Sequence, residues 1–441
     1  MDQKTVAMHN LGCKVNAYEM EHIAESLKNA GYEIVPFEGP ADYYIVNTCS
    51  VTNIADRKSR QMLHRAKNEN PDAVVIAAGC YVNTRGEDNV LADGIDIVVP
   101  NEQKKDMVDI IRSWEKSHND ETLDFDPASS LPSPAGTESG RDHAPAEGGY
   151  TRAFLKVQDG CNMFCSYCII PYARGRIQSR TVSDVVQEVT SLVAKGYHEF
   201  VLTGIHLSSF GKDRPADKES LLDLIRAVDA VPGADRIRLG SLEPRIITDE
   251  FAEALAEIPS ICPQFHLSLQ SGSDGVLKRM NRHYTADEFF EGTERLRRVF
   301  KDPAITTDVI VGFPGETPAE FEETQDFLKK ICFYETHIFP YSRRKGTPAD
   351  KMPDQLSRAE KHDRVVALKE LHDKNKTAFQ DIWLDGRTVE ILVEENNEGY
   401  TREYVRVRST TPLTSGAIVR GRITGRINAD TMEFTPETDE I

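Results

Sequence analysis

Six short apolar segments between residues 150 and 340 alternate with helical patterns, and this alternation restricts the fold more than any other feature. We expect strands at residues 153–158, 199–204, 236–241, 264–269, 305–312 and 335–339. The helical segment at residues 181–196 opens with a Thr181–Asp184 capping pair and keeps its apolar residues on one face. Repeated β/α units build a parallel sheet covered by helices, and six units over about 220 residues favour a partial (β/α)6 barrel over a closed eightfold one.

A second α/β pattern occupies residues 1–118. Its strand patterns, at residues 5–11, 43–48 and 73–79, are separated by helical patterns at residues 16–31 and 53–70. We expect Asn16 to cap the first of these helices. The βαβαβ order predicts an open parallel sheet with helices packed on it.

The remaining segments differ in composition from these two. Residues 119–149 are rich in proline, serine, glycine and acidic residues, which predicts a mobile linker before the barrel domain at residues 150–377. Residues 378–441 contain four short alternating strand patterns with turn residues between them, which predicts a small all-β barrel. The predicted fold class is therefore α/β, followed by this C-terminal β-module.

Charge and hydropathy bound the function before any motif is considered. No apolar run is long enough to cross a bilayer, and the N-terminus lacks the basic start and apolar core of a signal peptide, so we expect a cytoplasmic protein with no membrane partner. Cysteines in that compartment more often bind metal than form disulfides. The net charge of -18 argues against nucleic acid as a partner unless a local basic patch overrides it.

Three of the eight cysteines fall within eight residues, in the spacing Cys-x3-Cys-x2-Cys. Cys161, Cys165 and Cys168 follow the first predicted barrel strand, at the face where such barrels bind ligands. Three thiolates suit an iron–sulfur cluster, whereas a structural zinc ion would need a fourth ligand, and no further cysteine or histidine is nearby. One iron would therefore stay open for an exchangeable ligand. Three packed or zinc-bound cysteines are the alternative.

A second trio, Cys13, Cys49 and Cys80, is spread over the N-terminal domain, but each member follows a predicted strand. The carboxyl ends of parallel strands form one edge of the sheet, where ligands bind. We therefore expect the three thiols to converge as a second iron–sulfur site, with three ordinary buried thiols as the alternative. The remaining two, Cys262 and Cys332, are interpreted as core residues because their neighbours are apolar.

The first motif, with Tyr167 before its last cysteine, resembles the radical S-adenosylmethionine superfamily, in which the open iron chelates that cofactor. With the second trio and the terminal β-module, essentially the whole chain resembles the methylthiotransferase family, whose terminal module is a TRAM domain. The segments LGCKVNAYE, CSYCIIPYARGR and SLEP are most similar to the enzymes that modify N6-threonylcarbamoyladenosine next to the tRNA anticodon. At the position of GCKVN in this sequence, relatives that act on isopentenyladenosine usually have GCQMN, and those that act on a ribosomal protein usually have GCPKN.

This resemblance implies a tRNA-modifying enzyme that adds a methylthio group to C2 of N6-threonylcarbamoyladenosine. It also implies two [4Fe–4S] clusters, one for each cysteine trio, with S-adenosylmethionine as methyl donor and radical source. The expected partners are the tRNA anticodon stem-loop and a low-potential electron donor such as flavodoxin or ferredoxin, and we expect a monomer. The alternatives are methylthiolation of isopentenyladenosine tRNA or of a ribosomal protein and, outside the class, a non-catalytic RNA-binding iron–sulfur sensor.

Further cofactor-binding residues are predicted from their places in the cysteine motif and at strand ends. They are Tyr167, Thr203, Gly204, Ser241, Glu243, Gln270 and Gly312. Gly312 would let the backbone approach the adenine of the cofactor. Ordinary turn chemistry is the alternative explanation for the strand-end residues.

A local concentration of arginine offsets the acidic net charge. Between Gly399 and Arg426 the only acidic residue is Glu403, and the arginines are Arg402, Arg406, Arg408, Arg420, Arg422 and Arg426. Arginine suits phosphate groups and splayed loop bases, so we predict that this surface contacts RNA. The alternative is a solvated strand face paired with the acids of the segment VEENNE.

Overall fold

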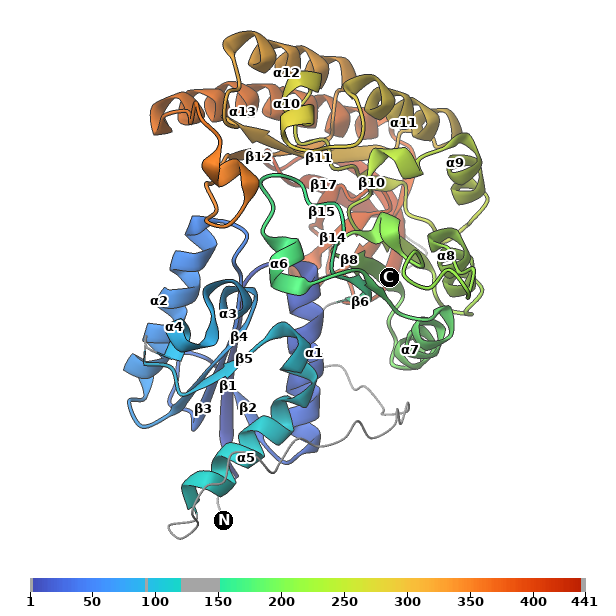
Figure 1. Ribbon diagram of the computed structural model, residues 1–441. Helices are drawn as coiled ribbons and strands as arrows, with labels where there is room; N and C mark the ends of the chain where they lie inside the picture. The colour runs from blue at the N-terminus through green and yellow to red at the C-terminus, as the bar shows by residue number, and fades with distance from the viewer. Residues whose placement is uncertain (1–2, 92–93, 120–150, 438–441) are drawn as a thin grey trace. The chain divides into compact units, whose positions relative to one another are not determined.

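The computed structural model describes residues 3–91, 94–119 and 151–437, and the chain divides into two compact units (Figure 1). The first unit consists of Met1–Ser50 and Ile54–Gly148, and the second of Val51–Asn53 and Gly149–Ile441. The predicted linker at residues 119–149 lies, apart from its first residue, outside the described residues. No helix in the described ranges is long and apolar enough to span a bilayer.

The first unit contains a parallel sheet with the strand order β2-β1-β3-β4-β5. The strands are β1 Thr5–Asn10, β2 Glu33–Val35, β3 Tyr43–Thr48, β4 Val74–Gly79 and β5 Ile97–Val99. The helices are α1 Lys14–Asn29, α2 Asn53–Glu69, α3 Cys80–Arg85, α4 Glu87–Leu91 and α5 Met107–Asn119. This sheet confirms the predicted open parallel α/β architecture.

Helices cover both faces of this sheet, which explains why β3 and β4 are apolar along almost their whole length. On one face, α1 and α5 contribute Ile23 and Ile111 to a buried cluster. On the other, Leu63 of α2 and Tyr81 of α3 pack against Val46. Each strand must therefore bury both alternating sets of side chains.

The predicted N-cap of α1 is wrong. The helix begins at Lys14 with Cys13 at the N-cap, and Asn16 lies buried in the first turn. The side-chain amide of Asn16 instead donates to the carbonyl oxygens of Leu11 (2.7 Å) and Thr48 (3.1 Å). These bonds hold Asn16 between the ends of β1 and β3, one turn inside the helix rather than at its N-cap.

The second unit contains six parallel strands in the order β6-β8-β9-β10-β11-β12. Two sheets, β7-β6-β8-β9 and β10-β11-β12, are joined by single bridges between Ile237 and Ile261 and between Leu242 and Leu267. The strands are β6 Arg152–Asp159, β8 Glu199–Gly204, β9 Arg236–Leu239, β10 Gln264–His266, β11 Ala304–Val311 and β12 Glu335–Pro340, with the antiparallel β7 Gln178–Ser179 at one edge. The predicted six-stranded partial barrel is confirmed.

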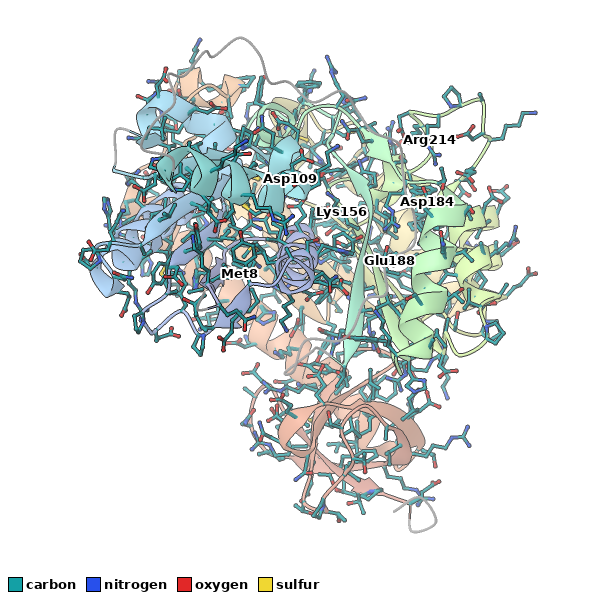
Figure 2. All side chains as sticks on the ribbon, turned by 90° about the horizontal axis from the view of Figure 1, so that it is seen from below. Met8, Asp109, Lys156, Asp184, Glu188 and Arg214 are labelled. Carbon is teal, nitrogen blue, oxygen red and sulfur yellow. The ribbon has the colours of Figure 1, made fainter. Side chains whose placement is uncertain are left out.

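Helices lie outside these strands (Figure 1), and a continuous apolar layer separates the two. They are α7 Val182–Ala194, α8 Leu221–Asp229, α9 Asp249–Ala256, α10 Asp274–Arg279, α11 Ala286–Val299, α12 Pro318–Ile331 and α13 Arg358–Asp381. The short helix α6 Ile170–Arg174 follows the cysteine motif and is not part of this layer. The Thr181 side chain accepts a hydrogen bond from the backbone N–H of Asp184, as predicted for the start of α7. Asp184 and Glu188 mark this helix in Figure 2.

A closed five-stranded barrel ends the chain, with the strand order β13-β14-β15-β17-β16. Its strands are β13 Thr388–Val393, β14 Glu398–Thr401, β15 Arg406–Ser409, β16 Ile418–Arg426 and β17 Met432–Pro436. Ile391, Val407 and Phe434 fill its interior. The small all-β module is confirmed, with one strand, β14, more than the sequence patterns predicted.

Two arginines on β9 join the six-stranded sheet to this C-terminal barrel. The fully buried Arg236 donates to the backbone oxygens of Tyr400 (3.1 Å) and Glu390 (2.9 Å). Arg238 donates to the carbonyl of Thr401 (2.8 Å) and pairs with the buried carboxylate of Glu199 (2.7 Å). Arg236 also pairs with the carboxylate of Glu390 (3.1 Å), so both guanidinium groups have a carboxylate partner, as buried charges require.

The two cysteines outside the trios differ in environment. Cys262 is buried, as predicted. Cys332 is exposed, so its interpretation as a core residue is wrong. It takes the left-handed conformation (φ 54°) that ends α12, and its thiol donates to the carbonyl of Lys329 (3.0 Å). Helix termination, rather than packing, sets its position.

Candidate functional site

The Cys-x3-Cys-x2-Cys motif lies on the loop that joins β6 to α6. This loop starts at Gly160, whose φ is 66°, and a Cβ atom added there would lie 1.9 Å from the carbonyl oxygen of Arg176. Both the conformation and the close approach therefore require glycine. The N–H of Cys161 donates to the carbonyl of Gly175 (3.1 Å), which fixes the start of the loop against the end of α6.

The three thiols of this motif are poorly solvated. Cys161 and Cys165 are buried, Cys168 is partly buried, and none forms a disulfide. Burial raises the pKa of the Cys168 thiol to about 12 and also raises the pKa of Cys161. A thiolate at these positions therefore needs a positive partner, and iron is such a partner for a set of three thiolates. The donor set fits the predicted cluster.

Arg282 supplies a fixed positive charge beside these thiols, although the sequence analysis did not single it out. Its Nη1 lies 3.2 Å from the sulfur of Cys165. The guanidinium is held by the hydroxyl of Tyr284 (3.0 Å) and the carbonyl of Ser268 (3.3 Å). Because Arg282 lies far from the cysteine motif in sequence, local spacing could not reveal this contact.

Thr203 and Gly204, at the end of β8, lie beside the cysteine loop. Thr203 is buried. A Cβ atom on Gly204 would lie 2.8 Å from the side-chain oxygen of Gln158. Gln158 in turn donates to the carbonyl of Gly160 (2.7 Å) and accepts from the N–H of His206 (2.8 Å). The absence of a side chain at Gly204 therefore lets Gln158 connect this strand end to the loop.

Glu243 and His206 form a buried polar pair at the ends of β9 and β8. A carboxylate oxygen of Glu243 lies 3.9 Å from Nε2 of His206, and the other accepts from Arg245 (2.9 Å). Burial lowers the pKa of His206 to about 4, so its imidazole is neutral at pH 7. Ser241, predicted with Glu243, is exposed. The buried carboxylate is thus the member of the predicted pair best suited to receive an ammonium group.

Gln270 and Gly312 occupy left-handed conformations near the carboxyl ends of the strands. Gln270 (φ 71°) extends the pairing with β11, because its N–H donates to Asp308 and its carbonyl accepts from Ile310. Gly312 has φ 69°, and a Cβ atom there would lie 2.4 Å from the side chain of Lys361 on α13. Turn conformation and this helix contact account for the glycine, and its contact with adenine stays a prediction.

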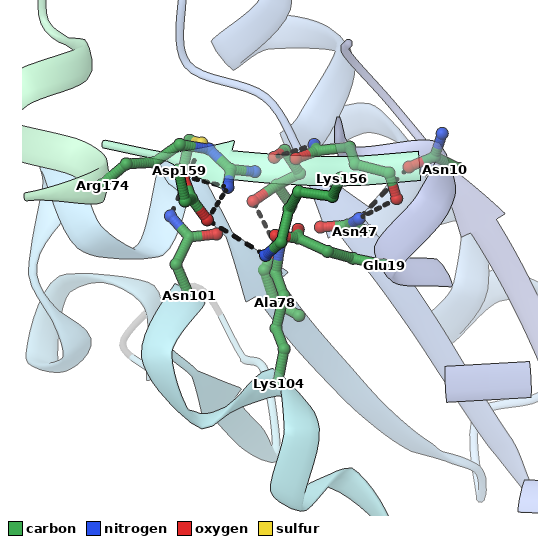
Figure 3. A network of polar contacts seen from close by, with 12 residues as sticks. Asn10, Glu19, Asn47, Ala78, Asn101, Lys104, Lys156, Asp159 and Arg174 are labelled. Atoms are coloured by element: carbon green, nitrogen blue, oxygen red, sulfur yellow. Dashed lines mark hydrogen bonds and ion pairs between the residues drawn. The ribbon is translucent and has the colours of Figure 1, made fainter. Parts of the chain in front are cut away.

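Tyr167 is held inside a small apolar cluster next to the last cysteine of the motif. It packs against Phe313 and Ile310. This cluster brings the cysteine loop against the end of β11. Nearby on β6, Asp159 is paired with Lys156 (3.1 Å) and with Arg174 of α6 (3.0 Å), as Figure 3 shows.

In the first unit, the strand register places Cys13, Cys49 and Cys80 after three adjacent strands. Asn10 pairs with Asn47, and Thr48 pairs with Gly79, so β1, β3 and β4 end at the same edge. A Cβ atom on Gly12 would lie 3.2 Å from the sulfur of Cys49, which shows that the first two loops are in contact. The predicted edge position of the trio is therefore present in the fold.

Amide side chains bind these strand ends together. Asn47 donates to Oδ1 of Asn10 (3.2 Å; Figure 3) and to the carbonyl of Asn16 (3.0 Å). Asn101 donates to the sulfur of Cys80 (3.6 Å), and Cys80 is buried whereas Cys13 is exposed. The edge that carries the three thiols is thus held in place by amide hydrogen bonds. Solvent exposure of the thiols decreases from Cys13 through Cys49 to Cys80.

Neither trio is gathered tightly enough to ligate a single ion. In the described ranges, the one group with three ligand atoms within 4.8 Å of one another is His266, Asp308 and His337. Sulfur ligands of one zinc ion would lie about 4 Å apart, since each Zn–S bond is about 2.3 Å. Within the described ranges neither trio meets that spacing, and the expectation of a cluster rests on the donor type, three thiolates in each trio.

The predicted RNA-contacting arginines fall into two groups. Arg402 donates to the carbonyl of Ile261 (2.8 Å), and Arg426 pairs with Asp381 of α13 (2.6 Å), so both attach the barrel to the rest of its unit. The other four lie on the outer faces of β15 and β16. They are Arg406, Arg408, Arg420 and Arg422.

Glu398 binds two of these outer arginines. It accepts from Arg406 (3.1 Å) and Arg408 (3.0 Å), and it belongs to the acidic segment VEENNE. The alternative of internal charge pairing is therefore realised for these two, while Arg420 and Arg422 are exposed. RNA contact stays a prediction.

Comparison with known proteins places this geometry in a family. The profile of the radical SAM superfamily matches residues 155–328, and that of the uncharacterized protein family UPF0004 matches residues 5–100. Threonylcarbamoyladenosine tRNA methylthiotransferase MtaB of Bacillus subtilis (strain 168) is 41% identical over 413 residues, covering 91% of this chain and 90% of the relative. This chain belongs to the radical SAM methylthiotransferase family. The predicted resemblance is confirmed.

Other relatives agree with this assignment. A protein of the same name from Aquifex aeolicus (strain VF5) is 36% identical, covering 94% of this methylthiotransferase-family chain and 99% of the relative. A tRNA-2-methylthio-N(6)-dimethylallyladenosine synthase from Clostridium tetani (strain Massachusetts / E88) is 32% identical, covering 99% and 96%. Among solved structures, the radical S-adenosylmethionine methyltransferase TsrM from Kitasatospora setae shares the fold, with a TM-score of 0.56, 18% identity and coverage of 79% of this chain and 74% of TsrM.

Proposed function

We propose that this chain is a tRNA-modifying enzyme that adds a methylthio group to C2 of N6-threonylcarbamoyladenosine next to the anticodon. The main support is the 41% identity, over 91% of the chain, to a relative named for this activity. The fold adds two cysteine trios, each at the carboxyl ends of parallel strands. The predicted partners, a tRNA anticodon stem-loop and a low-potential electron donor, and the monomeric state belong to this proposal.

Each cysteine trio would hold one [4Fe–4S] cluster. These are Cys161, Cys165 and Cys168 in the barrel domain, and Cys13, Cys49 and Cys80 in the N-terminal domain. When bound, the clusters and S-adenosylmethionine supply the radical chemistry that an unactivated C2–H bond requires. Side-chain acids and bases do not break such a bond usefully, so the role of this chain's side chains is to bind, orient and exclude water.

Two side chains near the barrel thiols suit these roles. The buried carboxylate of Glu243 would receive the ammonium group of S-adenosylmethionine, while the neutral His206 adds no competing charge. Arg282 would offset negative charge on the sulfur of Cys165. Glycine at position 160 lets the loop that bears the thiols turn tightly.

The test is a deletion strain complemented with wild-type or triple Cys→Ala genes. We expect 2-methylthio-N6-threonylcarbamoyladenosine to disappear from the tRNA on deletion and to return only with the wild-type gene. Purified wild-type protein reconstituted without oxygen should hold about eight irons, and either triple variant about half. Loss of the isopentenyl-type methylthio nucleoside instead, or about four irons in the wild type, would contradict the proposal.

A further inference from the structure

Three polar side chains meet on the strands β10, β11 and β12, away from the cysteine motif. His266, Asp308 and His337 have their ligand atoms within 4.8 Å of one another. Nε2 of His266 lies 3.2 Å from a carboxylate oxygen of Asp308, and the two imidazole rings stack with centroids 5.8 Å apart. Asp308 and His337 are paired in the sheet register. The cluster is therefore built on rigid, adjacent strands.

This cluster lies on the inner face of the partial barrel. Along β11, Ile305, Val309 and Val311 belong to the apolar layer against the helices. Side chains alternate along a strand, so Asp308 and Ile310 point to the opposite face. Figure 1 shows α11, α12 and α13 on the helix side of these strands. The cluster thus faces the space that the strands enclose.

Hydrogen bonds fix the protonation pattern of the cluster. Nδ1 of His266 lies 3.0 Å from the hydroxyl of Thr306. Because Nε2 of His266 faces a carboxylate, we assign the proton to Nε2, which leaves Nδ1 to accept from the Thr306 hydroxyl. One oxygen of Asp308 is used in this way and the other remains an acceptor. His337 is exposed and makes no hydrogen bond within the described part of the chain.

An aromatic surface continues this face toward the cysteine motif. Phe339 pairs in register with Ile310. Both lie two residues further along their strands than His337 and Asp308, and therefore on the same face. Ile310 packs against Tyr167, the residue before Cys168. Phe339 is 46% exposed, which is unusual for a large apolar side chain on an interior face. Exposed aromatic rings are the common platform for unstacked bases.

We propose that this inner face, made of His266, Asp308, His337 and Phe339, binds the modified nucleoside, an inference that rests on the proposed function. Phe339 stacks on the adenine, and the free oxygen of Asp308 accepts an N–H of the N6 substituent. His337 donates to the threonyl carboxylate. This carboxylate must lie closer to His337 than to Asp308, because two carboxylates repel each other. Asp308 and His337 therefore contact the groups that distinguish N6-threonylcarbamoyladenosine from adenosine, and His266 positions Asp308 through Nε2 (3.2 Å).

The test measures binding without turnover. Two fluorescent anticodon hairpins, identical except for N6-threonylcarbamoyladenosine or adenosine beside the anticodon, are titrated against reconstituted holoenzyme lacking S-adenosylmethionine and reductant. We expect wild type to prefer the modified hairpin about tenfold, and His337→Ala and Asp308→Ala, which remove the donor and the acceptor, to abolish that preference while binding of the unmodified hairpin is kept. Phe339→Ala should weaken both hairpins about tenfold, as loss of one stacked base does.

The matched control is His198→Ala, because His198 forms a similar histidine–aspartate pair with Asp235 (2.7 Å) on the surface. Iron content and thermal midpoint confirm that each variant is folded. Equal preference in wild type and in the His337 and Asp308 variants would overturn the inference, as would a wild type without preference. So would stoichiometric zinc or manganese that wild type retains and His337→Ala loses, since the cluster would then be a metal site. Absence of methylthiolation together with a retained hairpin preference would reject the proposed function alone.

Discussion

At the scale of single residues, the charge of Arg282 has a direct consequence for the barrel cluster. Its guanidinium lies 3.2 Å from the sulfur of Cys165 and is held by Tyr284 and Ser268. A reduced cluster carries one more negative charge than an oxidised one. Nearby positive charge and hydrogen bonds to sulfur therefore stabilise the reduced form.

Substituting Arg282→Met should lower the reduction potential of this cluster by tens of millivolts, on the order of a tenfold change in the one-electron equilibrium. The measurement is a redox titration of the holoenzyme followed by electron paramagnetic resonance. Arg214→Met is a suitable control, because Arg214 is also a partly buried arginine but pairs with a carboxylate, that of Glu219 (2.8 Å), rather than with a thiol. An unchanged midpoint in Arg282→Met would show that the guanidinium does not act on the cluster.

Gly160→Ala should reduce the iron content of the barrel site. The new Cβ atom would lie 1.9 Å from the carbonyl oxygen of Arg176, so the loop that carries the thiols must move. Gly196→Ala separates this clash from backbone strain, because Gly196 also has a positive φ (90°) but no atom within 4 Å of its added Cβ. We expect a loss of about four irons in the first variant and none in the second. Full iron content in both variants would show that the clash at position 160 does not disturb the cysteine loop.

The cysteines could be located from the sequence because their signals are local. One trio has a characteristic motif spacing, and each cysteine of the other follows a predicted strand. Arg282 and the His266–Asp308 pair could not be found in this way, since their partners lie on other strands or loops and only the register brings them together. Asn16 and Cys332 were misassigned for a related reason. Tertiary hydrogen bonds and helix termination overrode their local preferences.

At the scale of elements, the β/α alternation was sufficient to predict both parallel sheets, because buried parallel strands are continuous apolar runs. The strand β14 was missed. It has only four residues, and Gly399 within it lies so close to β13 that a Cβ atom would be 2.5 Å from the carbonyl of Leu392. A strand that requires glycine for close approach carries no apolar pattern to detect.

The contact between α13 and β12 should make stability depend on pH. Nδ1 of His372 accepts the N–H of Thr336 (3.1 Å), and burial, aided by Lys376, lowers the pKa of His372. Below about pH 6.5 the unfolded chain therefore binds a proton that the folded chain does not, and stability falls as the pH falls, by at most about 1.4 kcal/mol per pH unit.

We expect the thermal midpoint of His372→Gln to fall less than that of wild type between pH 7.5 and pH 6. Glutamine retains an acceptor oxygen for the N–H of Thr336 but does not titrate in this range. His362→Gln changes an exposed histidine of the same helix and should leave the wild-type dependence unaltered. Parallel curves for wild type and His372→Gln would refute the assignment.

At the scale of the whole molecule, acidic net charge and RNA binding are compatible only if the outer arginines act locally. Arg422→Ala should reduce the slope of log affinity for the tRNA against log salt concentration by about one, as the loss of one phosphate contact does. Arg402→Ala should leave the slope unchanged, because Arg402 is bonded to the carbonyl of Ile261, and should lower thermal stability instead. Equal slopes for Arg422→Ala and wild type would show that Arg422 makes no phosphate contact with the tRNA.

Arg236 and Arg238 affect the distance between two sites on the molecule, the C-terminal barrel and the strands next to the cysteine motif. Because these buried guanidinium groups tie β9 to the backbone of β13 and β14, the C-terminal barrel cannot swing independently of the strands that carry the reacting centre. For a barrel that contacts RNA as predicted, the distance between the bound stretch of RNA and the modified base would therefore be fixed by the fold. A base at another distance along the loop stays out of reach, so the molecule would choose its nucleotide partly by length.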